Sequence, residues 1–124
     1  MERVTGVGGV FLKAKDPAAL AGWYRDHLGF DLEPGSDAVT VFRWSEPGTT
    51  TWSAFADDTR YFGDRDARGM INYRVANLDR MLEQLRGAGV PVEDRVEVSQ
   101  FGRFGWATDP EGNRFELWEP PAGL

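Results

Sequence analysis

The second half of the sequence repeats the pattern of the first half at a constant offset. Residues 10–14 (VFLKA) resemble a strand and lead into Asp16, where a helical pattern begins. Residues 71–75 (INYRV) lead in the same way into Asn77 and a second helical pattern. An internal repeat largely decides the architecture, because each copy must be one supersecondary unit. The sequence therefore predicts two copies of the same unit.

Each repeat is predicted to contain one amphipathic helix. Apolar residues recur at helical spacing in both segments. Asp16 suits the N-cap of the first helix, Pro17 its first position and Gly29 the position just past its end. Asn77 suits the N-cap of the second helix, and Gly87 is expected to end it.

Short strand-like runs separated by turn residues follow each helix. They are predicted at 30–33, 38–44 and 50–56 in the first half, and at 92–98, 104–108 and 114–119 in the second. We therefore predict one α+β domain over residues 1–124, in which two tandem βαβββ modules form a cupped mixed or antiparallel sheet. The modules are expected at about 4–57 and 68–120, with a polar linker at about 58–67.

One face of such a sheet packs against its helix. The other face, called the open face from this point on, must be covered by something other than that helix. Since alternate residues of a strand share a face, Val10, Leu12, Phe115 and Leu117 are expected to pack inward. The open face then carries Phe11, Lys13, Met70, Asn72, Arg74, Arg114, Glu116 and Trp118. Apolar walls with a few polar groups are typical of a small-molecule site.

Further aromatic residues exceed what one small core needs, and we expect about half of them near the ligand. These candidates are Trp44, Trp52, Phe101, Phe104 and Trp106. Tryptophan near a concave face suits planar aromatic or cationic ligands. The segment 99–105 is either a mobile loop at the mouth of the cleft or a simple hairpin.

Composition excludes several classes of function. The chain has no cysteine, which excludes thiol chemistry, and a single histidine, His27, which excludes a zinc site with two histidines. Its net charge is −6 and its basic residues are scattered, so a nucleic acid partner is not expected. No apolar run is long enough to cross a membrane and no leader opens the chain, so we expect a cytoplasmic protein without a membrane partner.

Three segments resemble the vicinal oxygen chelate superfamily, which contains glyoxalase I, bleomycin-resistance proteins and extradiol dioxygenases. They are residues 10–30 (VFLKAKDPAALAGWYRDHLGF), 71–90 (INYRVANLDRMLEQLRGAGV) and 109–120 (DPEGNRFELWEP). The resemblance implies the glyoxalase/bleomycin-resistance fold and a homodimer. It does not decide the activity, because this superfamily includes lyases, dioxygenases, epimerases, thiol transferases and antibiotic binders.

Metal-using members of the superfamily hold one divalent cation through four residues, usually histidines and glutamates. The matching positions in this chain are Gly9, Met70, a residue within 53–55 and Glu116. Only Glu116 offers a suitable ligand for a hard cation. We therefore predict no metal site and no cofactor, with a divalent metal as the alternative if the matched positions are misplaced.

Two main functions remain open. The first is metal-independent binding of a small aromatic or cationic molecule, as in bleomycin-resistance proteins. The second is a lyase or isomerase in which Glu116 is the catalytic acid or base; alternatively Glu116 pairs with Arg114, Lys13 or Arg74. A third possibility is a regulatory or scaffolding dimer, which no residue specifically favours.

Overall fold

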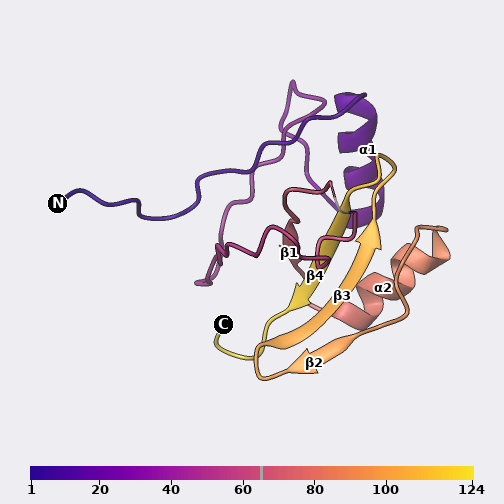
Figure 1. Ribbon diagram of the computed structural model, residues 1–124. Coiled ribbons are helices and arrows are strands. Elements are labelled where there is room, and N and C mark those ends of the chain that lie inside the picture. Colours follow the sequence, from indigo (N-terminus) through magenta and orange to yellow (C-terminus); the bar gives the residue numbers. More distant parts are fainter. Residues whose placement is uncertain (65) are drawn as a thin grey trace.

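Both predicted helices form, and a four-stranded mixed sheet lies beside them (Figure 1). The computed structural model describes residues 1–64 and 66–124. Its elements are α1 (Pro17–Leu28), β1 (Asn72–Arg74), α2 (Leu78–Gly87), β2 (Glu97–Ser99), β3 (Gly102–Thr108) and β4 (Arg114–Glu119). The α+β class predicted from the sequence is confirmed.

The strands are ordered β1-β4-β3-β2 across the sheet. β1 and β4 run parallel, with Asn72 opposite Glu116 and Arg74 opposite Trp118, whereas β3 is antiparallel to both β4 and β2. The parallel pair is possible because α2, β2 and β3 form a long connection between its two strands. The strand predicted at 114–119 is confirmed at both ends, and that predicted at 104–108 begins two residues earlier, at Gly102.

The helices begin at the predicted cap residues. The Asp16 side chain accepts a hydrogen bond from the Ala19 amide at 3.0 Å, and the Asn77 side chain accepts one from the Arg80 amide at 3.0 Å. Each bond satisfies a backbone donor that has no partner inside its helix. α1 ends at Leu28 and is capped by Gly29, whose φ of 73° favours glycine.

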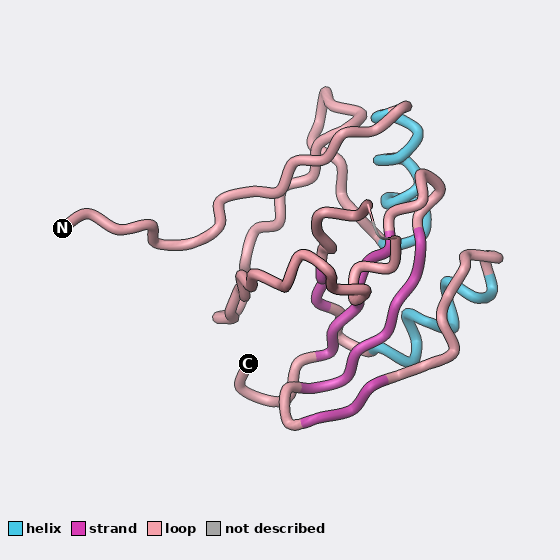
Figure 2. The backbone as a smooth tube through the Cα atoms, in the orientation of Figure 1, coloured by secondary structure: helices cyan, strands magenta, loops and turns pink. Residues whose placement is uncertain are grey.

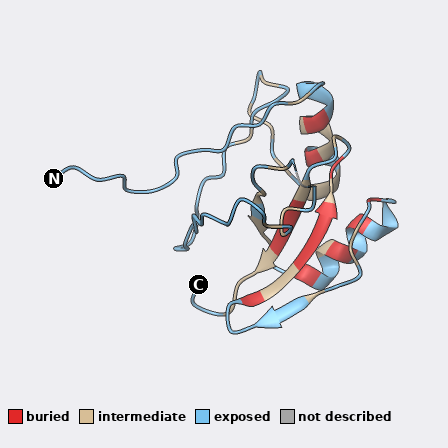
Figure 3. Cartoon of the chain, viewed as in Figure 1, coloured by how far each residue is buried: buried red, intermediate tan, exposed pale blue. Residues whose placement is uncertain are grey.

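The core lies between α2 and the sheet (Figure 3). Leu78, Leu82 and Leu85 of α2 pack with Phe115 and Leu117 of β4, and all five side chains are at most 2% exposed. The inward positions predicted for Phe115 and Leu117 are therefore confirmed. The opposite side of the sheet is the open face.

The helix α1 is tied to the turn between β3 and β4. Its Tyr24 is buried and donates a hydrogen bond from the hydroxyl to Asp109 Oδ2 at 2.8 Å. Asp109 also accepts from the amide nitrogen and the side chain of Asn113, so this buried carboxylate is satisfied. Burial raises the pKa of the Tyr24 hydroxyl, and the Asp109 carboxylate raises it further.

The strands predicted in the first half are not formed. Segments 10–14, 30–33, 38–44 and 50–56 are loops, apart from one isolated antiparallel bridge between Leu32 and Thr40 (Figure 2). Strand geometry is stable only when a neighbouring strand pairs with the backbone, and in the described part of the chain the bridge between Leu32 and Thr40 is the one pairing among these segments. The predicted strand at 92–98 is likewise reduced to a bridge at Val92 and a strand that begins at Glu97.

The opening segment lies away from the sheet (Figure 1). Val10 and Leu12 are 59% and 52% exposed, so their predicted inward packing is wrong in this structure. The division into two modules stays a prediction. Within residues 1–64 and 66–124, neither helix has the length and apolar character needed to cross a membrane.

Candidate functional site

The register of the sheet arranges the open face in two rows. In the first row Glu116 of β4 lies between Asn72 of β1 and Trp106 of β3. In the second row Trp118 of β4 lies between Arg74 of β1 and Phe104 of β3. These residues share a face because successive strand side chains alternate. The face therefore combines a carboxylate and an amide in one row with an arginine and aromatic rings in the next.

Glu116 is a buried carboxylate held by three neutral donors. It is 7% exposed and accepts hydrogen bonds from Asn72 Nδ2 at 2.7 Å, from Trp106 Nε1 at 3.0 Å and from the Tyr61 hydroxyl. A buried carboxylate is costly unless such donors replace its water. The alternative in which Glu116 pairs with Arg114, Lys13 or Arg74 is wrong: no ion pair involves Glu116 among the residues described.

Arg114 pairs instead with Glu93. Its Nε and Nη2 atoms lie 2.7 and 2.8 Å from the two carboxylate oxygens of Glu93, a bidentate arrangement. The Arg114 guanidinium lowers the pKa of the Glu93 carboxyl through these hydrogen bonds. Its Nη1 atom donates to the main-chain oxygen of Tyr61 and lies 3.5 Å from the Met70 sulfur. Arg114 thus fixes the predicted linker against the sheet.

Tyr61 covers the first row of the open face. Its ring stacks on Phe55 with centroids 5.5 Å apart and meets Trp106 edge to face at 6.2 Å. Burial raises the pKa of its hydroxyl, and the hydrogen bond to Glu116 raises it further. Tyr61 was not among the predicted site residues. The one signal for it in the sequence is an aromatic pair, Tyr61 and Phe62, inside an otherwise polar linker.

Arg74 of the second row lies against two tryptophan rings. The guanidinium carbon of Arg74 lies 5.3 Å from the ring centroid of Trp44 and 5.1 Å from that of Trp118. Trp118 also stacks on Phe104 at 6.3 Å, and its Nε1 donates to the main-chain oxygen of Phe101 at 2.8 Å. Trp44 belongs to a first-half loop, so residues from both halves meet in this row.

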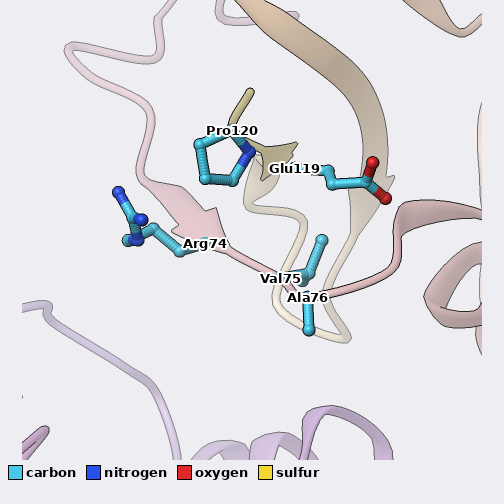
Figure 4. A pocket seen from close by; sticks show the side chains of 5 residues that line it. All are labelled: Arg74, Val75, Ala76, Glu119 and Pro120. Carbon is cyan, nitrogen blue, oxygen red and sulfur yellow. The ribbon is translucent and has the colours of Figure 1, made fainter. Parts of the chain in front are cut away.

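A shallow hollow adjoins this row. Its volume is about 280 Å³, and it is lined by Arg74, Val75, Ala76, Glu119 and Pro120 (Figure 4). The Oε1 atom of Glu119 accepts from the Leu78 amide at 2.8 Å and lies 3.9 Å from Arg103 Nη1. The hollow is thus lined by two charged side chains, Arg74 and Glu119.

The structure brings most of the predicted site residues together, and leaves some apart. The predicted residues that lie on the open face or contact it are Trp44, Met70, Asn72, Arg74, Phe101, Phe104, Trp106, Arg114, Glu116 and Trp118. Phe11 and Lys13 lie on the exposed opening segment, and Phe11 is 95% exposed. Trp52 is 78% exposed and lines a second hollow, of about 650 Å³, together with Val4 and Thr50.

The groups around Glu116 do not suit a divalent cation. Two nitrogen donors and a phenol point their hydrogens at this carboxylate, where a cation would need further oxygen or imidazole ligands. Across the described ranges, no cluster of three or more histidine, aspartate or glutamate side chains could hold a metal ion. The surroundings of Glu116 are therefore those of a hydrogen-bonded carboxylate and do not fit a metal centre.

Comparisons with known proteins agree with this fold. Residues 9–118 match the family model of the glyoxalase-like domain. TnmS3, an antibiotic binding protein from Streptomyces sp. CB03234, is 21% identical with a TM-score of 0.61, covering 98% of this chain and 100% of its own. A glyoxylase/bleomycin resistance protein/dioxygenase domain from Frankia sp. EAN1pec is 18% identical with a TM-score of 0.61, covering 98% and 96%.

Lactoylglutathione lyase from Agrobacterium tumefaciens is also similar. It is 18% identical with a TM-score of 0.55, and the match covers 95% of this chain and 96% of the lyase. No curated protein gave a significant sequence match. At these identities the solved structures show a shared fold and leave the activity open.

Proposed function

Because this chain belongs to the glyoxalase-like domain family, we propose that it binds a small aromatic or cationic organic molecule on its open face without a metal ion. The observation that carries the proposal is the environment of Glu116. This residue stands where the resemblance places a metal ligand, yet three neutral donors already occupy its carboxylate. The face that remains is aromatic and suited to binding.

The aromatic side chains favour a planar ligand over a cationic one. Trp44 is 58% exposed and Phe101 is 60% exposed, and both lie beside Trp118 or its contacts. Exposed aromatic rings next to the half-buried ring of Trp118 are typical of an interaction surface. The carboxylate at the centre of this face, Glu116, is already satisfied by three neutral donors, and Glu97 at the edge of the face lies 3.5 Å from Arg95. The name of TnmS3, an antibiotic binding protein, supports a binding role.

Calorimetric titration with neutral and cationic naphthalene compounds tests the proposal. We expect the Trp118→Ala variant to lose about fivefold or more in affinity, since stacking on one indole is worth on the order of 1 kcal/mol or more. Trp52→Ala is the matched control, because Trp52 lies outside the open face. Binding that depends on Trp52 and not on Trp118 would place the ligand elsewhere. Metal analysis of protein purified without chelators tests the metal-free state.

A lyase or isomerase that uses Glu116 as acid or base is the second candidate. The observation that favours it is the hydrogen bond between the Tyr61 hydroxyl and the Glu116 carboxylate, which places two proton-transfer groups in contact on the ligand-facing side. An activity that survives chelators and is lost in Glu116→Gln would support this candidate. Full activity in that variant would exclude the role of Glu116.

We also propose that the chain forms a homodimer. The opening segment presents Val10, Phe11 and Leu12 to solvent at 59%, 95% and 52% exposure, and a contiguous apolar run of this kind is typical of an interface. We expect light scattering to give twice the chain mass, and Phe11→Glu to shift the protein toward the monomer. A monomer at all concentrations would contradict this. We expect the protein to be cytoplasmic, with no nucleic acid or membrane partner.

A further inference from the structure

Glu116 places a negative charge at the centre of the open face, and no cation in the described part of the chain forms an ion pair with it. Its three hydrogen-bond donors are all neutral. Arg114, which lies nearby, directs its Nε and Nη2 atoms to Glu93. A ligand amine that reached Glu116 would therefore gain a charge-assisted hydrogen bond.

Tyr61 stands between this carboxylate and a ligand. Asn72 and Trp106 lie beside Glu116 within the sheet, on β1 and β3. Tyr61 comes from an irregular segment, so its hydroxyl approaches Glu116 Oε2 from outside the strands. Glu116 is only 7% exposed, although Asn72 beside it is exposed and Tyr61 is half-buried. The tyrosine is thus a layer that separates the carboxylate from solvent.

The ring of Tyr61 offers little to a cation in place of the carboxylate. It stacks on Phe55, with centroids 5.5 Å apart. The guanidinium carbon of Arg114 lies 5.8 Å from the centroid of the same ring. A second positive charge beside this ring would meet the like charge of Arg114, which disfavours it.

Main-chain contacts also hold Tyr61 in place. Arg114 Nη1 donates to the main-chain oxygen of Tyr61. Two residues further on, Gly63 has a φ of +89°, and a Cβ atom there would lie 2.9 Å from Arg114 Cδ. The backbone therefore passes close to Arg114 of β4. Because these contacts do not involve the phenol, we expect the segment to stay against the sheet when the Tyr61 side chain is shortened.

We infer that Tyr61 determines the charge specificity of the open face: it keeps organic cations away from Glu116 and leaves the aromatic second row to neutral planar ligands. The inference rests on the proposed binding function and names the class of ligand. Trp118 of the second row is two residues from Glu116 on β4, about 6.5 Å along the strand, so a substituent on a ring bound at Trp118 comes close to Glu116. An intervening ring adds about 3.5 Å, which prevents direct hydrogen bonding.

The test compares 2-naphthylmethylamine, a cation at neutral pH, with 2-naphthalenemethanol, a neutral compound of nearly the same shape. Calorimetric titration of the wild-type protein should show that the amine binds no more tightly than the alcohol. In Tyr61→Ala the amine should gain at least about tenfold relative to the alcohol, as expected for a charge-assisted hydrogen bond to a carboxylate. Adding Glu116→Gln to this variant should abolish the gain.

Phe62→Ala is the matched control. It removes an aromatic ring from the same segment, and this ring packs on Phe55 at 5.0 Å. The ratio of the two affinities should be the same as in the wild-type protein. Circular dichroism checks that each variant is folded.

Glu116→Gln alone gives a second measurement, with Tyr61 in place. The ratio of the two affinities should change by no more than about threefold, because a charge pair held apart beside water keeps only a weak attraction. A larger loss of amine binding would mean that the cation already contacts Glu116 in the wild-type protein, and would overturn the inference.

The outcomes separate this inference from the proposed function. A folded Tyr61→Ala variant in which the amine gains nothing over the alcohol would overturn the role of Tyr61 while binding itself stands. Failure of both compounds and of the rest of the naphthalene panel to bind the wild-type protein would contradict the proposed function, and this inference with it.

Discussion

The Tyr61 hydroxyl donates a hydrogen bond to the Glu116 carboxylate across 55 positions of sequence. Tyr61 belongs to the segment between the two halves, and Glu116 lies at the centre of β4. The bond joins an otherwise irregular segment to the sheet, and it closes one side of the open face. Its strength therefore bears on stability and on access to the face.

Tyr61→Phe should lower the free energy of unfolding by about 1–2 kcal/mol, because the variant removes a hydrogen bond to a buried carboxylate and keeps the ring. A double-mutant cycle with Glu116→Gln, measured by chemical denaturation, isolates the pairwise energy. We expect a coupling of at least about 0.5 kcal/mol. Strictly additive effects would mean that the two side chains do not interact in solution.

Gly102→Ala should be strongly destabilising. Gly102 has a φ of +116°, and a Cβ atom there would meet the main-chain oxygen of Glu119 and lie 2.8 Å from Trp118 Nε1. Strain and overlap together should cost at least about 2 kcal/mol. Gly112→Ala is the matched control, because its φ is +85° and no atom lies within 4 Å, so about 1 kcal/mol is expected. Equal losses in thermal denaturation would contradict the predicted overlap.

Acid should remove the stabilisation contributed by the pair of Glu93 and Arg114. The pKa of Glu93 is lower in the folded protein than its ordinary value of 4.5, so the contribution is complete above that value and is lost as the pH falls through the folded pKa. Since the Glu93 side chain is 42% exposed, we expect only about 0.5–1 kcal/mol.

The measurement is the difference in unfolding free energy between wild type and Glu93→Gln, from neutral pH to below 4.5. The difference should be present at neutral pH and vanish in acid. Glu83→Gln, at an exposed position on α2, should show no such pH-dependent difference. A Glu93→Gln difference that is constant with pH would exclude the ion pair as its cause.

Alkali should ionise the tyrosines only as the protein unfolds. Burial raises the pKa of Tyr73 to about 12 and also raises those of Tyr24 and Tyr61 above 10.0, and the chain has three tyrosines. A raised folded pKa means that the stabilisation is complete below the unfolded value and is lost as the pH rises through the folded one. Phenolate absorbance should therefore appear together with loss of circular dichroism. A tyrosine that ionises near 10 in folded protein would contradict this.

The sequence predicted those parts of the fold that local chemistry determines. Asp16 and Asn77 cap their helices as expected, because an N-cap needs only a short polar side chain and the amide that follows it. The alternation along 114–119 correctly placed Phe115 in the core, and Glu116 and Trp118 on the other face. Such patterns repeat every second or fourth residue, so a single segment contains enough information to predict which face each side chain occupies.

The sequence could not predict contacts made by irregular segments. The run 38–44 resembles a strand, yet its one described pairing is the bridge between Thr40 and Leu32, and it forms a loop that brings Trp44 to Arg74. Tyr61 lies in a polar linker, and its partner Glu116 is determined by tertiary packing. Strand pairing and long-range hydrogen bonds depend on where the chain returns in space, which no local pattern specifies.

The order of the sheet, β1-β4-β3-β2, places its two central strands last in the sequence. During synthesis, α1, β1, α2 and β2 therefore leave the ribosome before the strands that hold them together. α2 emerges with Leu82 and Leu85 unburied, because Phe115 and Leu117 have not yet been made. The sheet of this unit can therefore form fully only once residue 119 has emerged, and until then the apolar face of α2 stays exposed.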